Sequence, residues 1–187
     1  MRIDPATVQL LFVDAQLALV KGSSTGRPDA IDRASGVLAD CAALLGVPIA
    51  FSAVNEDGAE PTMLDTLRRH ASEDRVFVRD SASPFLDDAL KEHLRANGRR
   101  KLVIAGFASE VVVTHAAIDA IVEGYEVYLP LDAIGSIDPR TEAALMRQVE
   151  RAGGEVGSVA TFVTSLAPDF TRPQGKGVIA AVRTLSS

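Results

Sequence analysis

Two charged side chains stand directly after apolar runs, where they could carry out acid–base or anion-binding chemistry. Asp14 follows the run LLFV, and Arg79 follows the run VFV. A carboxylate in such a place is costly to desolvate unless it is paired, so Asp14 is either a turn cap or a general acid or base. Gln16, two residues on, could orient Asp14 or a ligand. Arginine keeps its proton and offers a rigid fork of donors, so Arg79 either pairs with Asp80 at the surface or holds an anionic or carbonyl group beside Asp14.

A short loop could supply backbone donors to the same site. Gly106, Phe107, Ala108 and Ser109 lead from an apolar run into a helix that is expected to start near Glu110. The first N–H groups of a helix have no partner within the helix and favour negative charge. This loop could therefore form an anion or oxyanion site, or it could be a plain strand-to-helix turn.

The remaining reactive side chains give weaker signals. His115 lies one helical turn after Val112 and either reaches the edge of the site or is packed or solvated. Cys41 lies in the apolar segment ASGVLADCAALLG, where core packing is the better interpretation. Because the sequence has no histidine pair at metal-ligand spacing and no glycine-rich phosphate loop, it predicts neither a catalytic metal nor a bound cofactor.

These residues must be positioned by strands and helices that alternate along the chain. Strands are expected at 8–13, 47–54, 76–78, 102–105 and 127–131, with a weaker sixth candidate at 155–159. Apolar spacings of three and four predict helices at 30–45, 61–70, 84–96, 110–123 and 141–152. The alternation predicts an α/β fold: a three-layer α/β/α, Rossmann-like structure whose six-stranded parallel sheet has helices on both faces. In such a sheet the ligand crevice lies beyond the carboxyl ends of the strands.

Composition limits the partners and the compartment. The chain of 187 residues, 47% apolar, is expected to form one domain over residues 1–187, with 169–187 as a C-terminal extension. This extension could add a short edge strand or reach onto a neighbouring subunit. The net charge of −6 argues against a nucleic-acid partner, which would need a clustered basic face. No apolar run is long enough to span a bilayer, and the N-terminal residues lack the features of a signal peptide, so we expect no membrane association and a cytoplasmic location.

Three sequence blocks, in this order, resemble the isochorismatase-like hydrolases, also called the cysteine hydrolase superfamily. They are LLFVDAQ, then GFASEVVV followed by GYEVYLPLDAIGS, and finally RTEAALMRQVERAGGEV. The resemblance extends over roughly residues 6–165. It implies a six-stranded parallel sheet, a small-molecule substrate, and a homo-oligomer that is a dimer or larger.

The resemblance also assigns roles to particular positions. Amidohydrolases of the family use an aspartate, a lysine and a cysteine, in which the cysteine attacks an amide carbon and the aspartate takes its proton. Asp14 matches the aspartate, Arg79 falls at the lysine, and Val112 falls at the cysteine. The oxyanion would be held by the amides of Ala108 and Val112, with a cis peptide bond between Phe107 and Ala108.

Valine at the cysteine position removes the nucleophile of the usual family route. In a serine protease, the loss of the nucleophile costs roughly a millionfold in kcat, so covalent amide hydrolysis is expected to be absent. Ser109, which stands where the family usually has threonine, and Thr114 carry the nearest hydroxyls. No histidine is placed to activate either of them. Lys21 could supply the missing ammonium if its loop folds back.

Two functions remain open. Isochorismatases of the family cleave a vinyl ether without the cysteine, with an aspartate as proton donor, and an arginine could bind the carboxylates of the substrate. Asp14 would then have to carry a proton, which burial favours and a nearby Arg79 opposes unless the substrate neutralises the arginine. The first hypothesis is therefore an isochorismatase-like hydrolase that acts on a small anionic metabolite without a covalent cysteine intermediate. The second is a non-catalytic relative that keeps the pocket as a binding site or serves as an assembly subunit. The sequence does not identify the substrate.

Overall fold

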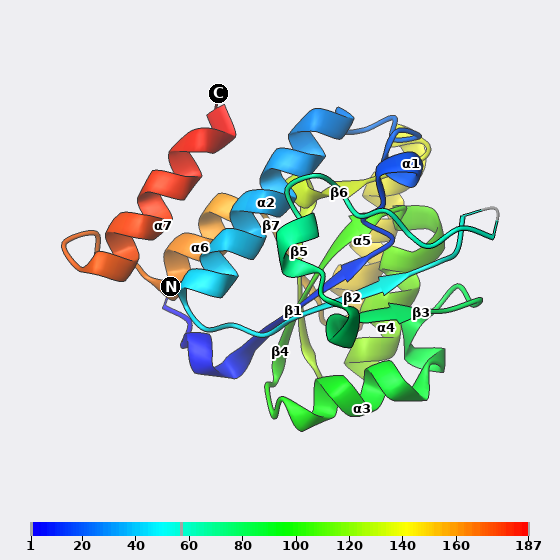
Figure 1. The fold of residues 1–187 in the computed structure, drawn as a ribbon, viewed down its shortest axis with the longest axis horizontal. Coiled ribbons are helices and arrows are strands. Elements are labelled where there is room, and N and C mark those ends of the chain that lie inside the picture. The colour runs from blue at the N-terminus through cyan, green and yellow to red at the C-terminus, as the bar shows by residue number, and fades with distance from the viewer. Residues whose placement is uncertain (1, 57, 187) are drawn as a thin grey trace.

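The computed structural model describes residues 2–56 and 58–186, which fold around one parallel β-sheet (Figure 1). Within these residues the sheet has seven strands, and its main path runs in the order β3-β2-β1-β4-β5-β7, with the two-residue β6 paired to β4. The strands are β1 (Val8–Val13), β2 (Ile49–Ala53), β3 (Val76–Val78), β4 (Lys101–Phe107), β5 (Glu126–Pro130), β6 (Ile134–Gly135) and β7 (Glu155–Gly157). All pairings are parallel. The weaker sixth strand expected at 155–159 is β7.

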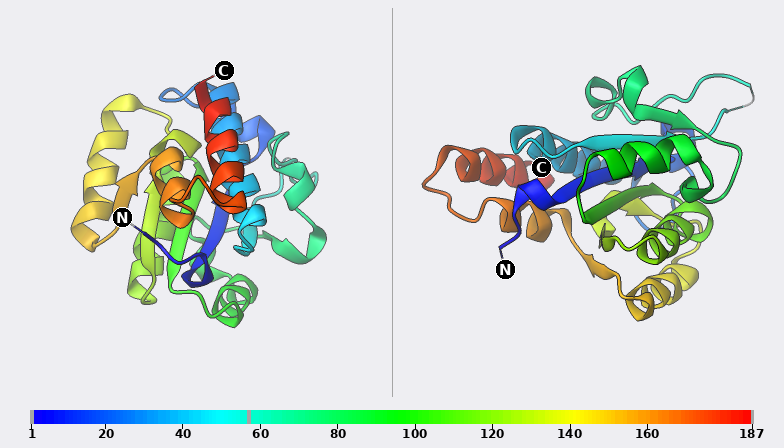
Figure 2. Two further views of the ribbon diagram at one scale, coloured as in Figure 1. Left: turned by 90° about the vertical axis from the view of Figure 1, so that its left-hand side faces the viewer. Right: turned by 90° about the horizontal axis from the view of Figure 1, so that it is seen from below.

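Helices cover both faces of the sheet, so the predicted three-layer fold is confirmed (Figures 1 and 2). On one face α2, α6 and α7 pack together, and on the other α4 packs against α5. The helices are α1 (Leu17–Val20), α2 (Pro28–Leu44), α3 (Asp88–Ala96), α4 (Thr114–Val122), α5 (Pro139–Ala152), α6 (Val159–Leu166) and α7 (Pro173–Arg183). None of the described helices is long and apolar enough to cross a membrane.

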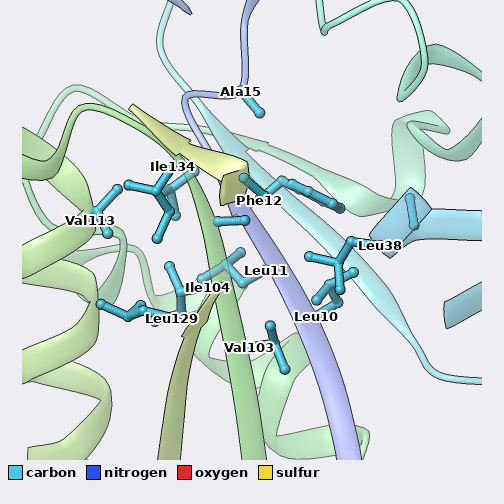
Figure 3. Packing of buried hydrophobic residues seen from close by; sticks show 14 of the residues in the cluster. Leu10, Leu11, Phe12, Ala15, Leu38, Val103, Ile104, Val113, Leu129 and Ile134 are labelled. Carbon is cyan, nitrogen blue, oxygen red and sulfur yellow. The ribbon is translucent and has the colours of Figure 1, made fainter. Parts of the chain in front are cut away.

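The two central strands, β1 and β4, form the core of the protein. Every residue of both strands is buried. Figure 3 shows Leu11 of β1 packed near Ile104 of β4 and Leu129 of β5, whereas Phe12 points away from these two residues. Phe12 stacks on Phe51 of β2, with 5.4 Å between the ring centroids. Each large apolar side chain buried in this way stabilises the fold by about 1.5–3 kcal/mol. For this reason the sequences of strands that are covered on both faces are mostly apolar.

Gly106 allows β1 and β4 to approach closely near their carboxyl ends. Its φ is +138°, and a Cβ atom at this position would lie 1.8 Å from the carbonyl oxygen of Val13. Only glycine fits such a contact. From β1 the sheet extends through β2 and β3 to one edge, and from β4 it extends through β5 and β7 to the other. The carboxyl ends of β1 and β4 therefore form the switch point at which parallel sheets of this kind place their ligands.

One expectation about local structure was wrong. The helix expected at 61–70 is reduced to a 3-10 turn, Arg68–His70. The backbone around Met63 instead pairs with Gln16 in an antiparallel bridge, and Leu64 donates its N–H to the carbonyl of Ala15. A segment held extended by these long-range bonds cannot form the helix that its own spacing favours.

The tail does not add an edge strand. Described residues of the 169–187 extension form α7, which packs on α2 of the same chain. Val178 is completely buried there. Gly177 faces Leu44 so closely that a Cβ atom would come within 2.6 Å of the leucine side chain. Small residues on one side of α7 thus bring the helix against α2, where it buries apolar surface more effectively than a short exposed strand would.

Candidate active site

A pocket of about 480 Å³ opens at the carboxyl ends of β1, β3 and β4. Seven of its eleven lining residues are apolar, and the polar remainder consists of two carboxylates, one guanidinium and one hydroxyl. The lining residues are Asp14, Leu19, Val54, Arg79, Asp80, Ser81, Ala82, Phe107, Ala108, Val111 and Ile137. A largely apolar pocket with a few convergent polar groups is the usual form of a small-molecule site.

Asp14 occupies a backbone conformation that is unusual for its residue type. Its φ is +47°, and it is the one residue other than glycine with a positive φ in the described part of the chain. Its N–H donates to the carbonyl oxygen of Ser52 on β2 at 2.8 Å, so the strand ladder fixes the backbone up to the turn. Residues with a side chain occupy this region at some cost in free energy, and such residues cluster at functional sites.

The carboxylate of Asp14 forms a buried, two-pronged ion pair with Arg79. The Nη1 and Nη2 atoms of Arg79 donate to Oδ1 and Oδ2 of Asp14 at 2.7 and 2.9 Å. The side chain of Arg79 is 3% exposed and that of Asp14 is 8% exposed. Of the two alternatives for Arg79, the structure therefore places it beside Asp14. Since both carboxylate oxygens act as acceptors, Asp14 is arranged as a base, and it would have to leave the guanidinium before it could donate a proton.

One donor of Arg79 has no acceptor. Its Nε atom is buried and makes no hydrogen bond with the described residues. A buried donor without a partner costs about 1–3 kcal/mol, and most native structures avoid it. The guanidinium at the pocket therefore retains hydrogen-bonding capacity that the described protein groups do not satisfy.

The turn after β4 adds a backbone donor to the pocket. The peptide bond between Phe107 and Ala108 is cis, as the resemblance implies. The carbonyl oxygen of Ala108 accepts the N–H groups of Val111, Val112 and Val113 at 3.0–3.2 Å. The amide of Val112 is therefore bonded within the turn. The N–H of Ala108, in contrast, donates to no group in residues 2–56 and 58–186, and Ala108 lines the pocket.

Val112 lies beneath the pocket surface. Its side chain is completely buried and is absent from the pocket lining, which includes Ala108 and Val111 of the same turn. The nearby hydroxyls are also outside the pocket lining and are engaged elsewhere. Ser109 donates to the carbonyl of Gly135 at 3.2 Å, and Thr114 donates to the carbonyl of Ser109 at 2.7 Å. Neither hydroxyl is placed to replace the nucleophile.

Gln16 and His115 do not line the pocket, so neither is placed to contact a ligand directly. Gln16 is buried, and its side-chain amide bonds both backbone groups of Val54 at 3.0 Å, together with the carboxylate of Glu56. It thus holds Val54, a residue of the pocket wall, rather than Asp14. His115 is exposed on α4 and does not line the pocket. Lys21 is likewise exposed and absent from the pocket wall.

The structure thus brings together four of the predicted site residues and separates the others from the pocket surface. Asp14, Arg79, Phe107 and Ala108 line the pocket, whereas Gln16, Ser109, Val112 and His115 do not.

Several residues of the pocket wall were not predicted from the sequence. Asp80, Ser81 and Ala82 directly follow Arg79, so the same strand-end rule could have found them. Val54 ends a strand expected from the sequence and Val111 lies in an expected helix, but nothing in the sequence separates them, or Ile137, from other apolar residues.

Other reactive groups do not contribute to this site. Cys41 is buried in α2, and burial, with a smaller contribution from Asp40, raises the pKa of its thiol to about 12. A thiol with such a pKa is a poor nucleophile. In the described part of the chain, no three side chains of His, Cys, Asp or Glu are grouped so that they could hold a metal ion.

Comparison with known proteins assigns the family. The Isochorismatase domain model matches residues 8–161, and the chain therefore belongs to the isochorismatase family. The protein called probable hydrolase YcaC of Escherichia coli is 24% identical over 156 residues, which cover 83% of this chain and 75% of that protein.

Solved structures agree on the fold. The crystal structure of the Escherichia coli YcaC gene product, described as an octameric hydrolase of unknown specificity, has a TM-score of 0.87 and covers 99% of this chain and 89% of its own. YcaC from Pseudomonas aeruginosa, solved with hexane-2,5-diol and covalent acrylamide, has a TM-score of 0.89 at 22% identity and covers 99% of this chain and 94% of its own. At these identities the likeness establishes a shared α/β fold, that of the isochorismatase-family hydrolases.

Proposed function

We propose that this protein is a hydrolase that acts on a small anionic metabolite without a covalent cysteine intermediate. The observation that carries the proposal is the buried Asp14–Arg79 pair in a largely apolar pocket. A chain that had lost all function at this site would have little reason to keep two charges out of water, because removing ions from water is costly.

Arg79 would bind the anionic group of the substrate. A substrate carboxylate that approaches the guanidinium competes with Asp14 for the same fork of N–H donors. When the substrate takes over part of this pairing, Asp14 loses its countercharge while its side chain is only 8% exposed. A desolvated carboxylate without a countercharge favours its protonated form. Substrate binding would thereby convert Asp14 from an acceptor into a proton donor.

Hydrolysis of an enol ether uses such a donor and needs no protein nucleophile. Asp14 delivers its proton to the terminal carbon of the double bond, which leaves an oxocarbenium ion. A water molecule adds to the positive carbon and returns a proton to Asp14, and the resulting hemiketal splits into an alcohol and a ketone. The balance is one enol ether and one water in, one alcohol and one ketone out, with Asp14 regenerated.

The rest of the pocket suits this reaction. Leu19, Val54 and Val111 provide apolar surface for the body of the substrate. The N–H of Ala108 is a donor that could polarise an oxygen of the substrate, which is the part of an oxyanion site that this chain retains. The amide of Val112 contributes less because it is bonded to the carbonyl of Ala108.

We further propose that the protein acts as a homo-oligomer. The support comes from the octamer described for the Escherichia coli YcaC gene product, whose chain superimposes over most of its length. Static light scattering of the purified protein tests this proposal, because a monomeric mass would contradict it.

A second candidate function is a binding protein without catalysis. It is favoured by one observation: Val112 is buried and carries no nucleophile, while Arg79 replaces the lysine of the family pattern. In this alternative the pocket binds a small anion but leaves it unchanged.

A thermal-shift screen with small carboxylates, amides and enol ethers tests the proposal, and hits are then assayed for hydrolysis. The informative variant is Asp14→Asn/Arg79→Gln, which removes both charges together and so leaves no unpaired buried charge. Asp80→Asn is the matched control, since it removes an exposed carboxylate from the same pocket. We expect enol-ether carboxylates to stabilise the wild type and the control but not the double variant. Equal stabilisation of the double variant would contradict the proposed role of Arg79, and binding without turnover would favour the non-catalytic candidate.

A further inference from the structure

One wall of the pocket belongs to the segment Gly135–Asp138, which connects β6 to α5. Ile137 is half-exposed and lines the pocket, although it lies far along the chain from Asp14 and Arg79. Ile137 does not belong to the apolar core formed by the described residues, so its position depends on how the backbone of the segment is fixed.

The carboxylate of Glu110 holds the backbone of this segment through hydrogen bonds. One oxygen of Glu110 accepts the N–H of Ile137 at 3.0 Å, and the other accepts the N–H of Asp138 at 3.1 Å. The second oxygen also accepts the hydroxyl of Thr141 at 2.6 Å. Two successive backbone amides and one hydroxyl therefore converge on one side chain, an arrangement that fixes both the place and the direction of the segment.

Glu110 connects two parts of the pocket. It lies between Ala108 and Val111, both of which line the pocket after β4. Its hydrogen bonds to the amides of Ile137 and Asp138 join this turn to a segment 27 and 28 residues further along the chain.

The opposite side of the segment is held by a separate set of bonds. Ser136 donates its hydroxyl to Glu142 at 3.0 Å and its N–H to the hydroxyl of Thr25 at 3.1 Å. Thr25 in turn donates to Glu142 at 2.8 Å. The loss of Glu110 would therefore release Ile137 and Asp138 while Ser136 stays anchored.

We propose that Glu110 is a positioning residue that holds Ile137 against the pocket, and that Ile137 thereby determines which apolar groups the pocket accepts. The inference rests on the proposed function to the extent that the pocket binds a small molecule; it does not depend on catalysis. Glu110 acts through Ile137 and makes no contact with the ligand itself.

A double-mutant cycle with the fluorescent probe 1-anilinonaphthalene-8-sulfonate, which has an apolar body and one anionic group, tests the inference. We expect Ile137→Ala and Glu110→Ala each to weaken probe binding about fivefold, and Glu110→Ala to add little in the Ile137→Ala background, because coupled residues are not additive. Glu110→Gln keeps one acceptor oxygen and should fall between the wild type and Glu110→Ala. The matched control is Glu123→Gln, which removes the same charge near the end of α4, where Glu123 pairs only with Arg95, and should bind as the wild type does.

Additive losses would overturn the inference, because a merely structural effect of Glu110 would weaken binding equally with and without the Ile137 side chain. Failure of the wild type to bind the probe would also overturn it. The Asp14→Asn/Arg79→Gln variant separates this inference from the proposed function. If that variant keeps its affinity for the probe while the Glu110–Ile137 coupling persists, the anion-binding role of Arg79 is wrong and the positioning role of Glu110 stands.

Amide hydrogen exchange gives a readout without any ligand. In Glu110→Ala, the amides of Ile137 and Asp138 should exchange faster, whereas the amide of Ser136, bonded to Thr25, should keep its protection. Unchanged exchange at residues 137 and 138 would overturn the inference.

Discussion

The carboxyl ends of the two central strands contribute different features to the pocket. At the end of β1, Asp14 has a positive φ and a buried ion pair with Arg79. At the end of β4, the cis peptide bond before Ala108 is present, but Val112 leaves this turn without a nucleophile. Valine is close to cysteine in size, so the turn can keep its packing. The comparison shows that a turn can keep its backbone geometry without a reactive side chain, so that any proton transfer by a side chain at these two strand ends must come from Asp14 after β1.

Gly106→Ala should have the largest effect, because it forces the two strand ends apart. The new Cβ atom would lie 1.8 Å from the carbonyl oxygen of Val13, at a φ of +138°. We expect a loss of about 4 kcal/mol or more in the free energy of unfolding, or failure to fold. Urea denaturation followed by circular dichroism measures this loss. Gly124→Ala is the control, since it also has a positive φ but no atom within 4 Å of the added Cβ; an equal loss in both variants would show that strand proximity is not the cause.

Asp14→Asn tests the β1 side alone. It leaves Arg79 buried without a countercharge, and breaking a buried ion pair in this way costs about 3–5 kcal/mol. The same change removes the proposed proton donor. We therefore expect a lower melting temperature together with loss of turnover, whereas Asp80→Asn, at an exposed position, should change stability by about 0.5 kcal/mol or less. A variant that is as stable as the wild type would contradict the importance of the pair.

Val112→Cys tests the β4 side. The substitution nearly conserves volume, so the free energy of unfolding should change by less than about 1.5 kcal/mol. We expect no amide hydrolysis, because the side chain at 112 is buried beneath the pocket and the described residues that line the pocket include no lysine. The new thiol should also resist alkylation by iodoacetamide, against a low background because Cys41 is buried. Amide turnover by this variant would show that the nucleophile was the one missing part.

The smallest expected effect concerns the pH dependence of the segment that Glu110 holds. Burial acts to raise the pKa of Glu110, but hydrogen bonds from Thr141 and from the amides of Ile137 and Asp138 outweigh it, so the pKa lies below its usual value of 4.5. A carboxyl group whose pKa is lowered by folding stabilises the protein above its unfolded pKa, and this contribution is lost as the pH falls through the folded pKa. Glu110→Gln should therefore lose less stability than the wild type when the pH is lowered from 6 to below 4.5. Parallel stability curves for the two proteins would contradict this expectation.

Much of the fold could be predicted from the sequence because local and global signals agree. Val8–Val13, which is apolar apart from Gln9, and the apolar run Val76–Val78 both form strands with the expected bounds. The helix predicted at 61–70 is absent because the antiparallel bridge between Met63 and the distant Gln16 overrides the local spacing of apolar residues. Of the two alternatives for the tail, the edge strand is wrong because α7 packs on α2, and the contact with a neighbouring subunit stays a prediction. The cytoplasmic location and the extent of the domain, residues 1–187, stay predictions.

Residues of the site could be predicted where they directly follow a strand, but not where they lie in a loop that folds back onto the pocket. Asp14 and Arg79 come directly after apolar runs, so the direction of the strands places both at one edge of the sheet. Val54 directly follows β2 and obeys the same rule, whereas Ile137 reaches the pocket through the loop between β6 and α5. Gln16 holds Val54 and Glu110 holds Ile137. Such long-range hydrogen bonds cannot be predicted from a local pattern of residues.

The most direct test of the proposed chemistry follows a solvent deuteron into the product. A small enol-ether carboxylate with an apolar body, 2-(cyclohexyloxy)acrylate, is incubated in deuterated water with the wild type or Asp14→Asn/Arg79→Gln. If Asp14 protonates the double bond, the wild type should release cyclohexanol and pyruvate with one deuterium in its methyl group, and the variant should release neither above background. Equal rates for the two proteins would contradict the role of Asp14. No turnover of any enol ether by the wild type would contradict the proposed hydrolase.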